Sequence, residues 1–162
     1  MKNKIFLSVI FIVLSVAFFS CDTDENCRKD NYIVLKVDFK KATIDTLGIQ
    51  RLSAFSVDSV IVSGLDNDSI LYNNRKKISS VDLFLNKFAE QSYYEISFND
   101  TIDTLVVWHR NTESYLSFEC GCQTTHLVDA IAITGHFIDS ISIINNEVNT
   151  LNATNIELYR HY

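Results

Sequence analysis

The sequence predicts an all-β domain, an antiparallel β-sandwich of Ig-like or jelly-roll-like type, behind an N-terminal signal peptide. Apolar and polar residues alternate with a period of two in many short runs, and clusters of Asn, Asp and Ser separate these runs. Many short strands at this spacing, without a series of amphipathic helices between them, are typical of sandwiches and barrels. The chain has no Pro and only four Gly, so residues that tolerate a left-handed backbone must make the turns.

The first twenty residues have the pattern of a secretory signal peptide. Lys2 and Lys4 form a short basic start, and residues 5–19 carry no charge. A permanent membrane helix needs about 20 apolar residues, so this shorter run favours an export signal over a membrane anchor helix. We expect a signal peptide at 1–20, a lipidated Cys with a short tether at 21–31, and the sandwich domain at 32–162.

Cys21 is the predicted site of lipid attachment. The run Phe18-Phe19-Ser20-Cys21 resembles a lipobox, in which a signal peptidase cuts before a Cys that has been diacylated on its sulfur. Phe18 and Phe19 depart from the residues that are commoner there, whereas Ser20 fits. Two or more acyl chains anchor a protein stably. We therefore expect the membrane to be a partner of the mature protein through this anchor.

The mature domain is acidic. Without the two lysines of the first twenty residues, twelve basic residues face twenty acidic ones, which gives a net charge of −8 with His neutral. Such a balance, without a basic patch, argues against nucleic acid as a partner.

The predicted strands follow one another along the whole domain. In the first, Ile33, Leu35, Val37 and Phe39 alternate with more polar residues. Similar runs lie at 57–63, 69–72, 94–98, 105–107, 115–120, 138–144 and 156–158. The predicted turns between them lie at 64–68, 99–100, 110–113 and 145–147.

Residues 79–88 fit two patterns. Ser79 with Asp82 three positions on would cap a short helix. The same stretch also alternates as a strand, with residues 92–98 as the partner in a β-hairpin. We favour the hairpin.

Three cysteines follow the lipid site, and an exported chain meets an oxidising compartment, so we expect a disulfide. A Cys120–Cys122 bond would close a small, strained ring. A bond from Cys27 to Cys120 or to Cys122 closes a loop of more than ninety residues, worth about 4–5 kcal/mol in the chain-entropy model. Of these two pairings we adopt Cys27–Cys120, which leaves Cys122 unpaired.

The segment Cys120-Gly121-Cys122 also supports a chemical alternative. With His126, and with His109 as a further ligand, its thiols are soft ligands at a spacing that suits zinc or copper. One cluster with one nearby His is a weak signal, so we expect no metal and no cofactor.

The sequence contains no nucleophile elbow, no phosphate-binding Gly loop and no paired-His metal helix. We therefore expect a domain that is not an enzyme. His136 and His161 fit ordinary surface histidines.

Trp108 is expected on the strand face opposite Leu105 and Val107. There it would either fill the second face of a covered strand or form a platform on which sugars stack. Its partners in such a platform would be Tyr93, Tyr94, Tyr115 or Tyr159.

Asp followed by Ser or Thr and then an aliphatic residue occurs six times. This tripeptide fits a turn that leads into a strand. It also resembles the acceptor motif for O-glycosylation in exported proteins of Bacteroidetes-type bacteria, and the two interpretations are compatible. The candidate acceptors are Thr46, Ser59, Ser69, Thr101, Thr104 and Ser140.

Five features of the chain together resemble a family of small, uncharacterised Bacteroidetes-type lipoproteins. They are the lipid Cys, the second Cys six residues on, the 33–39 strand, the run Glu119-Cys120-Gly121-Cys122 and the closing 138–159 segment. The resemblance covers essentially the whole mature chain. It implies that Cys27 and Cys120, which match the family's positions, pair with each other. This chain departs from the family in lacking Pro near the first strand and in having Cys122. The resemblance implies no activity.

The leading hypothesis is a non-enzymatic envelope domain that binds a glycan, a protein or an envelope complex. The alternatives are a redox or metal-handling protein that uses Cys120, Cys122 and His126, and a hydrolase. Asp directly after Cys21 resembles the inner-membrane retention cue of enteric bacteria. The acidic residues Asp22, Asp24 and Glu25 together resemble a surface-export cue of Bacteroidetes-type lipoproteins. We expect an outer-membrane lipoprotein that faces outward, with the periplasmic side as the alternative.

We expect thiol counting of the exported protein under denaturing conditions to find one reactive thiol. Cys21 carries the lipid, Cys27 and Cys120 are paired, and only Cys122 remains to react. Three reactive thiols would contradict the disulfide.

Overall fold

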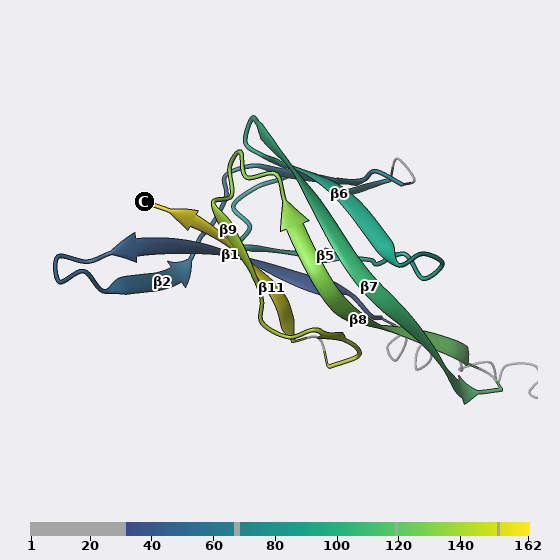
Figure 1. Ribbon diagram of the computed structural model, residues 1–162. Coiled ribbons are helices and arrows are strands. Elements are labelled where there is room, and N and C mark those ends of the chain that lie inside the picture. Colours follow the sequence, from purple (N-terminus) through teal and green to yellow (C-terminus); the bar gives the residue numbers. More distant parts are fainter. Residues whose placement is uncertain (1–31, 67–68, 119, 152) are drawn as a thin grey trace, which may run out of the picture.

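The computed structural model describes residues 32–66, 69–118, 120–151 and 153–162 (Figure 1). Within these ranges the regular elements are all strands, which confirms the predicted all-β class. None of the described residues belongs to a helix that is long and apolar enough to cross a membrane. The strands are β1 (Leu35–Ile44), β2 (Gln50–Ala54), β3 (Val60–Gly64), β4 (Ile70–Arg75), β5 (Ser80–Leu83), β6 (Gln91–Phe98), β7 (Thr101–Ser117), β8 (Gly121–Ile133), β9 (Ser140–Ile143), β10 (Glu147–Val148) and β11 (Thr154–His161).

These strands form two sheets that pack as a sandwich. One sheet has the order β2-β1-β11-β9, and β5 also pairs with β1. The other has the order β10-β8-β7-β6-β3-β4. The pairing is antiparallel except between β1 and β11, which run parallel. Two hairpins extend beyond the sandwich at opposite ends, β1–β2 at one end and β7–β8 at the other (Figure 1).

The core fills the space between the inner faces of the sheets. In β1 the predicted alternation is confirmed, because Leu35, Val37 and Phe39 are almost fully buried. Phe39 meets Phe98 of the opposite sheet edge to face, with ring centroids 5.3 Å apart. Phe98 in turn stacks on Phe137 at 4.9 Å. Burial of each such ring contributes about 2–3 kcal/mol, so these aromatic contacts hold the two sheets together.

The predicted hairpin of residues 79–98 is wrong in its pairing, although both strands exist. β5 pairs with β1 in one sheet, whereas β6 pairs with β3 and β7 in the other. Both strands bury alternate residues, such as Val81 and Leu83 on β5 and Ile96 on β6. Two strands that face each other across a sandwich bury the same alternating pattern as two that lie side by side, so the pattern alone does not separate these arrangements.

The predicted turn at residues 110–113 is also wrong. β7 runs through it without a break and pairs with β8 from Leu105 to Ser117. The actual turn follows Ser117, where Gly121 adopts a φ of +70° that a residue with a side chain rarely takes. The run resembles a turn in composition because Arg110, Thr112 and Glu113 are exposed polar residues, whereas Asn111 is half-buried.

Asp103 fixes the connection from β8 to β9. Its carboxylate is fully buried and accepts hydrogen bonds from the Thr134 hydroxyl and the backbone N–H groups of His136, Phe137 and Ile138 at 2.6–2.9 Å. Burial alone would raise the pKa of Asp103, but these four donors outweigh it and the pKa lies below its ordinary value. The connection that places the Phe137 ring in the core thus depends on one carboxylate.

We expect Asp103→Asn to lower the free energy of unfolding by about 2–3 kcal/mol, because an amide offers one acceptor oxygen to four donors and leaves buried N–H groups unpaired. Urea unfolding measures this loss. Asp100→Asn is the matched control, since Asp100 is an exposed carboxylate in the adjacent turn, and it should leave stability unchanged. Equal stability of the two variants would show that Asp103 does not hold the connection.

Candidate functional site

The connection from β5 to β6, residues 84–90, crosses from one sheet to the other and forms the candidate site. Its Leu85 side chain is buried at 8% exposure, whereas Phe84 and Phe88 are exposed at 53% and 86%. Asn86 shapes the loop, because its side-chain oxygen accepts a hydrogen bond from the Phe88 N–H at 3.0 Å. One buried residue and one local turn therefore hold two aromatic rings in solvent.

A polar network beneath the loop ties it to β6 and β7. The Asn111 amide donates hydrogen bonds to the carbonyls of Asn86 at 3.2 Å and Ala89 at 2.8 Å. The Ser92 hydroxyl accepts a hydrogen bond from the Asn86 N–H at 2.8 Å. The backbone N–H of His109 donates a hydrogen bond to the Glu90 carbonyl at 2.9 Å. The loop is thus fixed by hydrogen bonds to the side chains of Ser92 and Asn111 and to the backbone of His109.

Two histidines complete this network. The Nδ1 atoms of His109 and His126 lie 2.8 and 2.7 Å from the Asn111 side-chain oxygen. Because the Asn111 amide nitrogen already donates to two carbonyls, its oxygen accepts, and both Nδ1 atoms carry hydrogen. His109 Nε2 then accepts from the Ser92 hydroxyl at 2.9 Å. The two rings meet edge to face with centroids 5.3 Å apart.

Both histidines are neutral at pH 7. Burial lowers the pKa of His109 below its ordinary value. Burial, together with the neighbouring His109, lowers the pKa of His126 to about 4. A neutral network of this kind makes its hydrogen bonds without burying a charge, which favours one rigid arrangement of the loop.

The loop borders two adjacent hollows of about 420 and 480 Å³. We call them together the loop groove. The residues that line both hollows are Asp66, Asn86, Phe88 and Tyr93. Lys87 and Ser92 belong to the first hollow, and Glu90 and Gln91 to the second.

An aromatic surface lies beside the groove on the outer face of the six-stranded sheet. Gln91 pairs with Trp108, and Tyr93 pairs with Val106. These residues alternate with the buried ones, and Trp108 lies on the face opposite Leu105 and Val107, as predicted. The Tyr93 hydroxyl donates a hydrogen bond to the Gln91 side chain, which orients its ring. Trp108 and Tyr93 are diagonal neighbours across β6 and β7, close enough for one ligand to contact both.

The cysteines and histidines of the metal alternative do not gather in one place. Cys122 is exposed and free, and it shares a hollow of about 250 Å³ with His126. Four positions along a strand separate their backbones by roughly 13 Å, too far for both side chains to bind one ion. Among the described residues, no three His, Cys, Asp or Glu side chains lie close enough together to hold a metal.

The remaining predicted residues are scattered. Cys21 and Cys27 lie outside the described residues, and Cys120 lies in the turn between β7 and β8. His136 and His161 are exposed.

The glycosylation candidates differ in accessibility. Thr46 is exposed in a turn in which Asp45 accepts hydrogen bonds from the N–H groups of Leu47 and Ile49. At Thr104 the turn interpretation is wrong, because Asp103 lies within β7 and is buried. The other candidates, Ser59, Ser69, Thr101 and Ser140, are half-buried, as is Thr104.

The sequence reasoning missed the network that holds the loop. The sequence pattern predicts a turn at Asn111 and a hairpin strand at Ser92, and it marks His109 only as a metal ligand. The signal was present, because His109 and Asn111 continue the inward alternation of Leu105 and Val107 along one strand. Two polar residues at inward positions indicate a buried hydrogen-bonded network.

The fold and the groove define a β-sandwich domain that presents a ligand-sized hollow on a rigidly held loop. The chain belongs to the family of unknown function DUF6452, which matches residues 59–160, more than half of its length. The matched range contains the whole network and the loop groove, whereas β1, β2 and Cys21 precede it. No curated protein and no solved structure matches the chain.

We expect the fold to lose stability as the pH falls from about 6.5 to about 4. In an unfolded chain His has a pKa of about 6.5, whereas burial lowers that of His126 to about 4 in the folded protein. Between these values only the unfolded chain binds the proton, so the free energy of unfolding is greatest above about 6.5 and declines by about 2 kcal/mol toward about pH 4. Urea unfolding at a series of pH values measures the decline.

The matched variants are His126→Gln and His161→Gln. The first removes the buried histidine and should flatten the decline, and the second removes an exposed histidine and should leave it as steep. An equally steep decline in His126→Gln would show that this ring is not the titrating group.

Proposed function

We propose that the chain is a lipid-anchored domain of the bacterial cell envelope, without enzymatic activity, that binds a neutral carbohydrate in the loop groove. The observation that carries the proposal is the combination of exposed aromatic rings and hydrogen-bonding groups along one rigid groove. Phe88 is 86% exposed at its rim, and Tyr93 and Trp108 continue the aromatic surface along the outer face of the sheet.

The aromatic rings supply the stacking half of carbohydrate recognition. A pyranose ring has an apolar face of C–H groups, which packs against an aromatic ring and is released from water in doing so. Rings fixed in advance lose little conformational freedom when a ligand binds. The network under the loop and the bond from Tyr93 to Gln91 supply this fixation.

The polar groups of the groove supply the hydrogen bonds that orient a bound sugar. Asp66, Asn86 and Gln91 line the groove and offer carboxylate and amide groups to sugar hydroxyls. Two carboxylates, from Asp66 and Glu90, also border the second hollow. They repel an anionic ligand from the second hollow, whereas Lys87 lines the first. A groove with charges of both signs favours a ligand without net charge, such as a neutral sugar.

The location is proposed from the N-terminal sequence. Residues 1–20 have the pattern of an export signal, and Cys21 follows as the lipid site. The acidic residues after Cys21 favour the outer membrane and an outward-facing domain, and the periplasmic side is the alternative. A Bacteroidetes-type lipoprotein with this topology would hold its groove toward the glycans of the envelope.

We expect isothermal calorimetry against a panel of neutral oligosaccharides to find saturable binding. Phe88→Ala should weaken the affinity about fivefold, because it removes one stacking contact worth about 1 kcal/mol. Phe118→Ala is the matched control, since it removes another highly exposed ring that lies past the far end of β7, away from the groove. Binding that Phe88→Ala leaves unchanged, or no binding across the panel, would overturn the proposal.

A further inference from the structure

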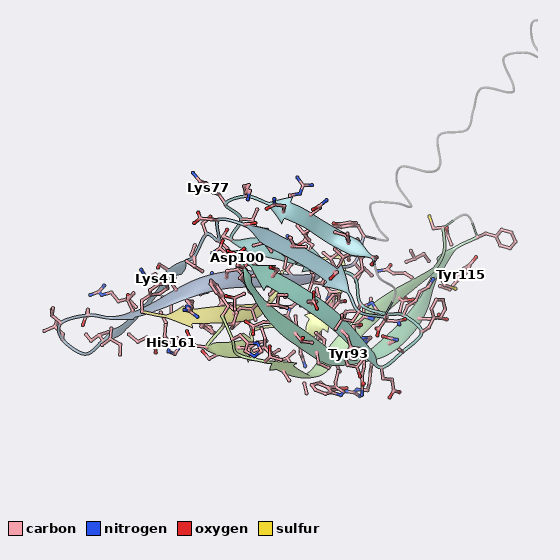
Figure 2. The ribbon with its side chains drawn as sticks, turned by 90° about the horizontal axis from the view of Figure 1, so that it is seen from above. Lys41, Lys77, Tyr93, Asp100, Tyr115 and His161 are labelled. Carbon is pink, nitrogen blue, oxygen red and sulfur yellow. The ribbon has the colours of Figure 1, made fainter. Side chains whose placement is uncertain are left out.

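The turn between β7 and β8 presents an apolar end that no described part of the chain covers. Phe118 is 99% exposed, Tyr115 63% and Leu116 40%. We call these three residues the hairpin tip. Figure 2 shows Tyr115 close to the far end of the projecting hairpin, well away from the body of the sandwich. Exposed apolar groups gathered at the end of a rigid projection indicate a surface that something apolar covers.

The described chain begins on the same side of the molecule as this hairpin. Ile33 borders one hollow together with Cys122, Gln123 and Thr124 of β8. Tyr32 contacts the β5–β6 loop, with its ring 5.7 Å from that of Phe84. The described chain therefore begins beside β8.

The proposed disulfide shortens the path from the lipid to the tip. Cys120 lies two residues after Phe118, and its N–H donates a hydrogen bond to the Ser117 hydroxyl across the turn at 3.0 Å. Cys21 and Cys27 are six residues apart, which spans at most about 20 Å. With Cys27 bonded to Cys120, the distance from the lipid to the turn is at most about 20 Å plus the length of the disulfide.

We infer that the hairpin tip enters the membrane interface and is a second membrane contact beside the lipid. The inference rests on the proposed lipid anchor. Aromatic and aliphatic side chains are the groups that partition between lipid headgroups and acyl chains. Residues 111–121 contain no Lys or Arg, and their charged residues are Glu113 and Glu119. The guanidinium of Arg110 is paired with Asp129 at 2.8 Å, and the basic residues Arg28 and Lys29 follow Cys27 in the tether. The contact of the tip is therefore made by its apolar side chains and not by basic residues of the hairpin.

The opposite end of the molecule offers a matched control. The β1–β2 hairpin also projects (Figure 1), and it exposes Ile44 at 72% and Leu47 at 79%. Its apolar character is similar, but it lies at the opposite end of the sandwich from the hairpin tip. The two hairpins thus separate an effect of position from one of hydrophobicity.

The test uses the full lipidated chain in vesicles of phosphatidylcholine brominated on its acyl chains, which quench nearby tryptophan. Trp108 is the single tryptophan of the chain, so Trp108→Phe gives a silent background. Phe118→Trp or Leu47→Trp then places one reporter at either end. We expect the reporter at 118 to lose about half of its emission, because interfacial side chains reach roughly 5–10 Å into the bilayer, and the reporter at 47 to lose almost none.

Each other outcome overturns the inference in a distinguishable way. Vesicle-bound protein with neither reporter quenched shows an anchored domain whose tip stays in water. Equal quenching of both reporters shows a domain that lies along the membrane. Protein that fails to float with the vesicles shows that the lipid anchor itself is absent, which removes the basis of the inference and of the proposed location together.

Discussion

The Asn111 side chain makes the hydrogen bonds on which the arrangement of the site depends. Its oxygen accepts from two imidazole rings and its nitrogen donates to two carbonyls of the β5–β6 loop. An amide that donates and accepts at once fixes the tautomers of both histidines, and one of these orients Ser92. The loop has a single buried apolar side chain, Leu85, so packing alone would not define its course. The hydrogen bonds of one residue supply that definition.

The network matters because the loop joins two sheets rather than two strands of one sheet. A short hairpin takes its shape from its turn, whereas a crossing loop must be fixed by contacts with the body of the domain. β7 makes these contacts possible, because it continues past the end of the core and carries His109 and Asn111 under the loop. The rigidity of the groove follows from the length of that strand.

The sequence predicted the class of the fold and most of its strands, because alternation is a local property. Leu35, Val37 and Phe39 are buried as their spacing predicts. Pairing is not local, and so the partners of β5 and β6 were assigned wrongly. Residues 110–113 resemble a turn in composition, because Arg110, Thr112 and Glu113 are exposed polar residues on the outer part of a two-stranded ribbon. β8, whose residues alternate weakly, was not predicted.

The candidate site was harder to predict than the fold. The strand periodicity offers a platform of Trp108 with Tyr93 only as the alternative to a covered strand face. Phe88 and the groove depend on how the loop crosses the sandwich. The strand periodicity predicts inward positions for Ser92 and Asn111. A polar residue in a strand pattern nevertheless indicates a turn unless its buried hydrogen-bond partners are known. Buried polar networks join residues distant in sequence, here positions 86, 92, 109, 111 and 126.

The length of the β7–β8 ribbon acts as a spacer. Phe118, just past the end of β7, lies seven positions after Asn111 beneath the groove, a distance of roughly 23 Å in an extended strand. If that end enters the bilayer as proposed, the length of the ribbon sets the distance between the groove and the lipid headgroups. A groove at this short distance from the membrane would contact polymers that lie on the same membrane or are attached to it. Molecules farther from the membrane surface would be out of its reach.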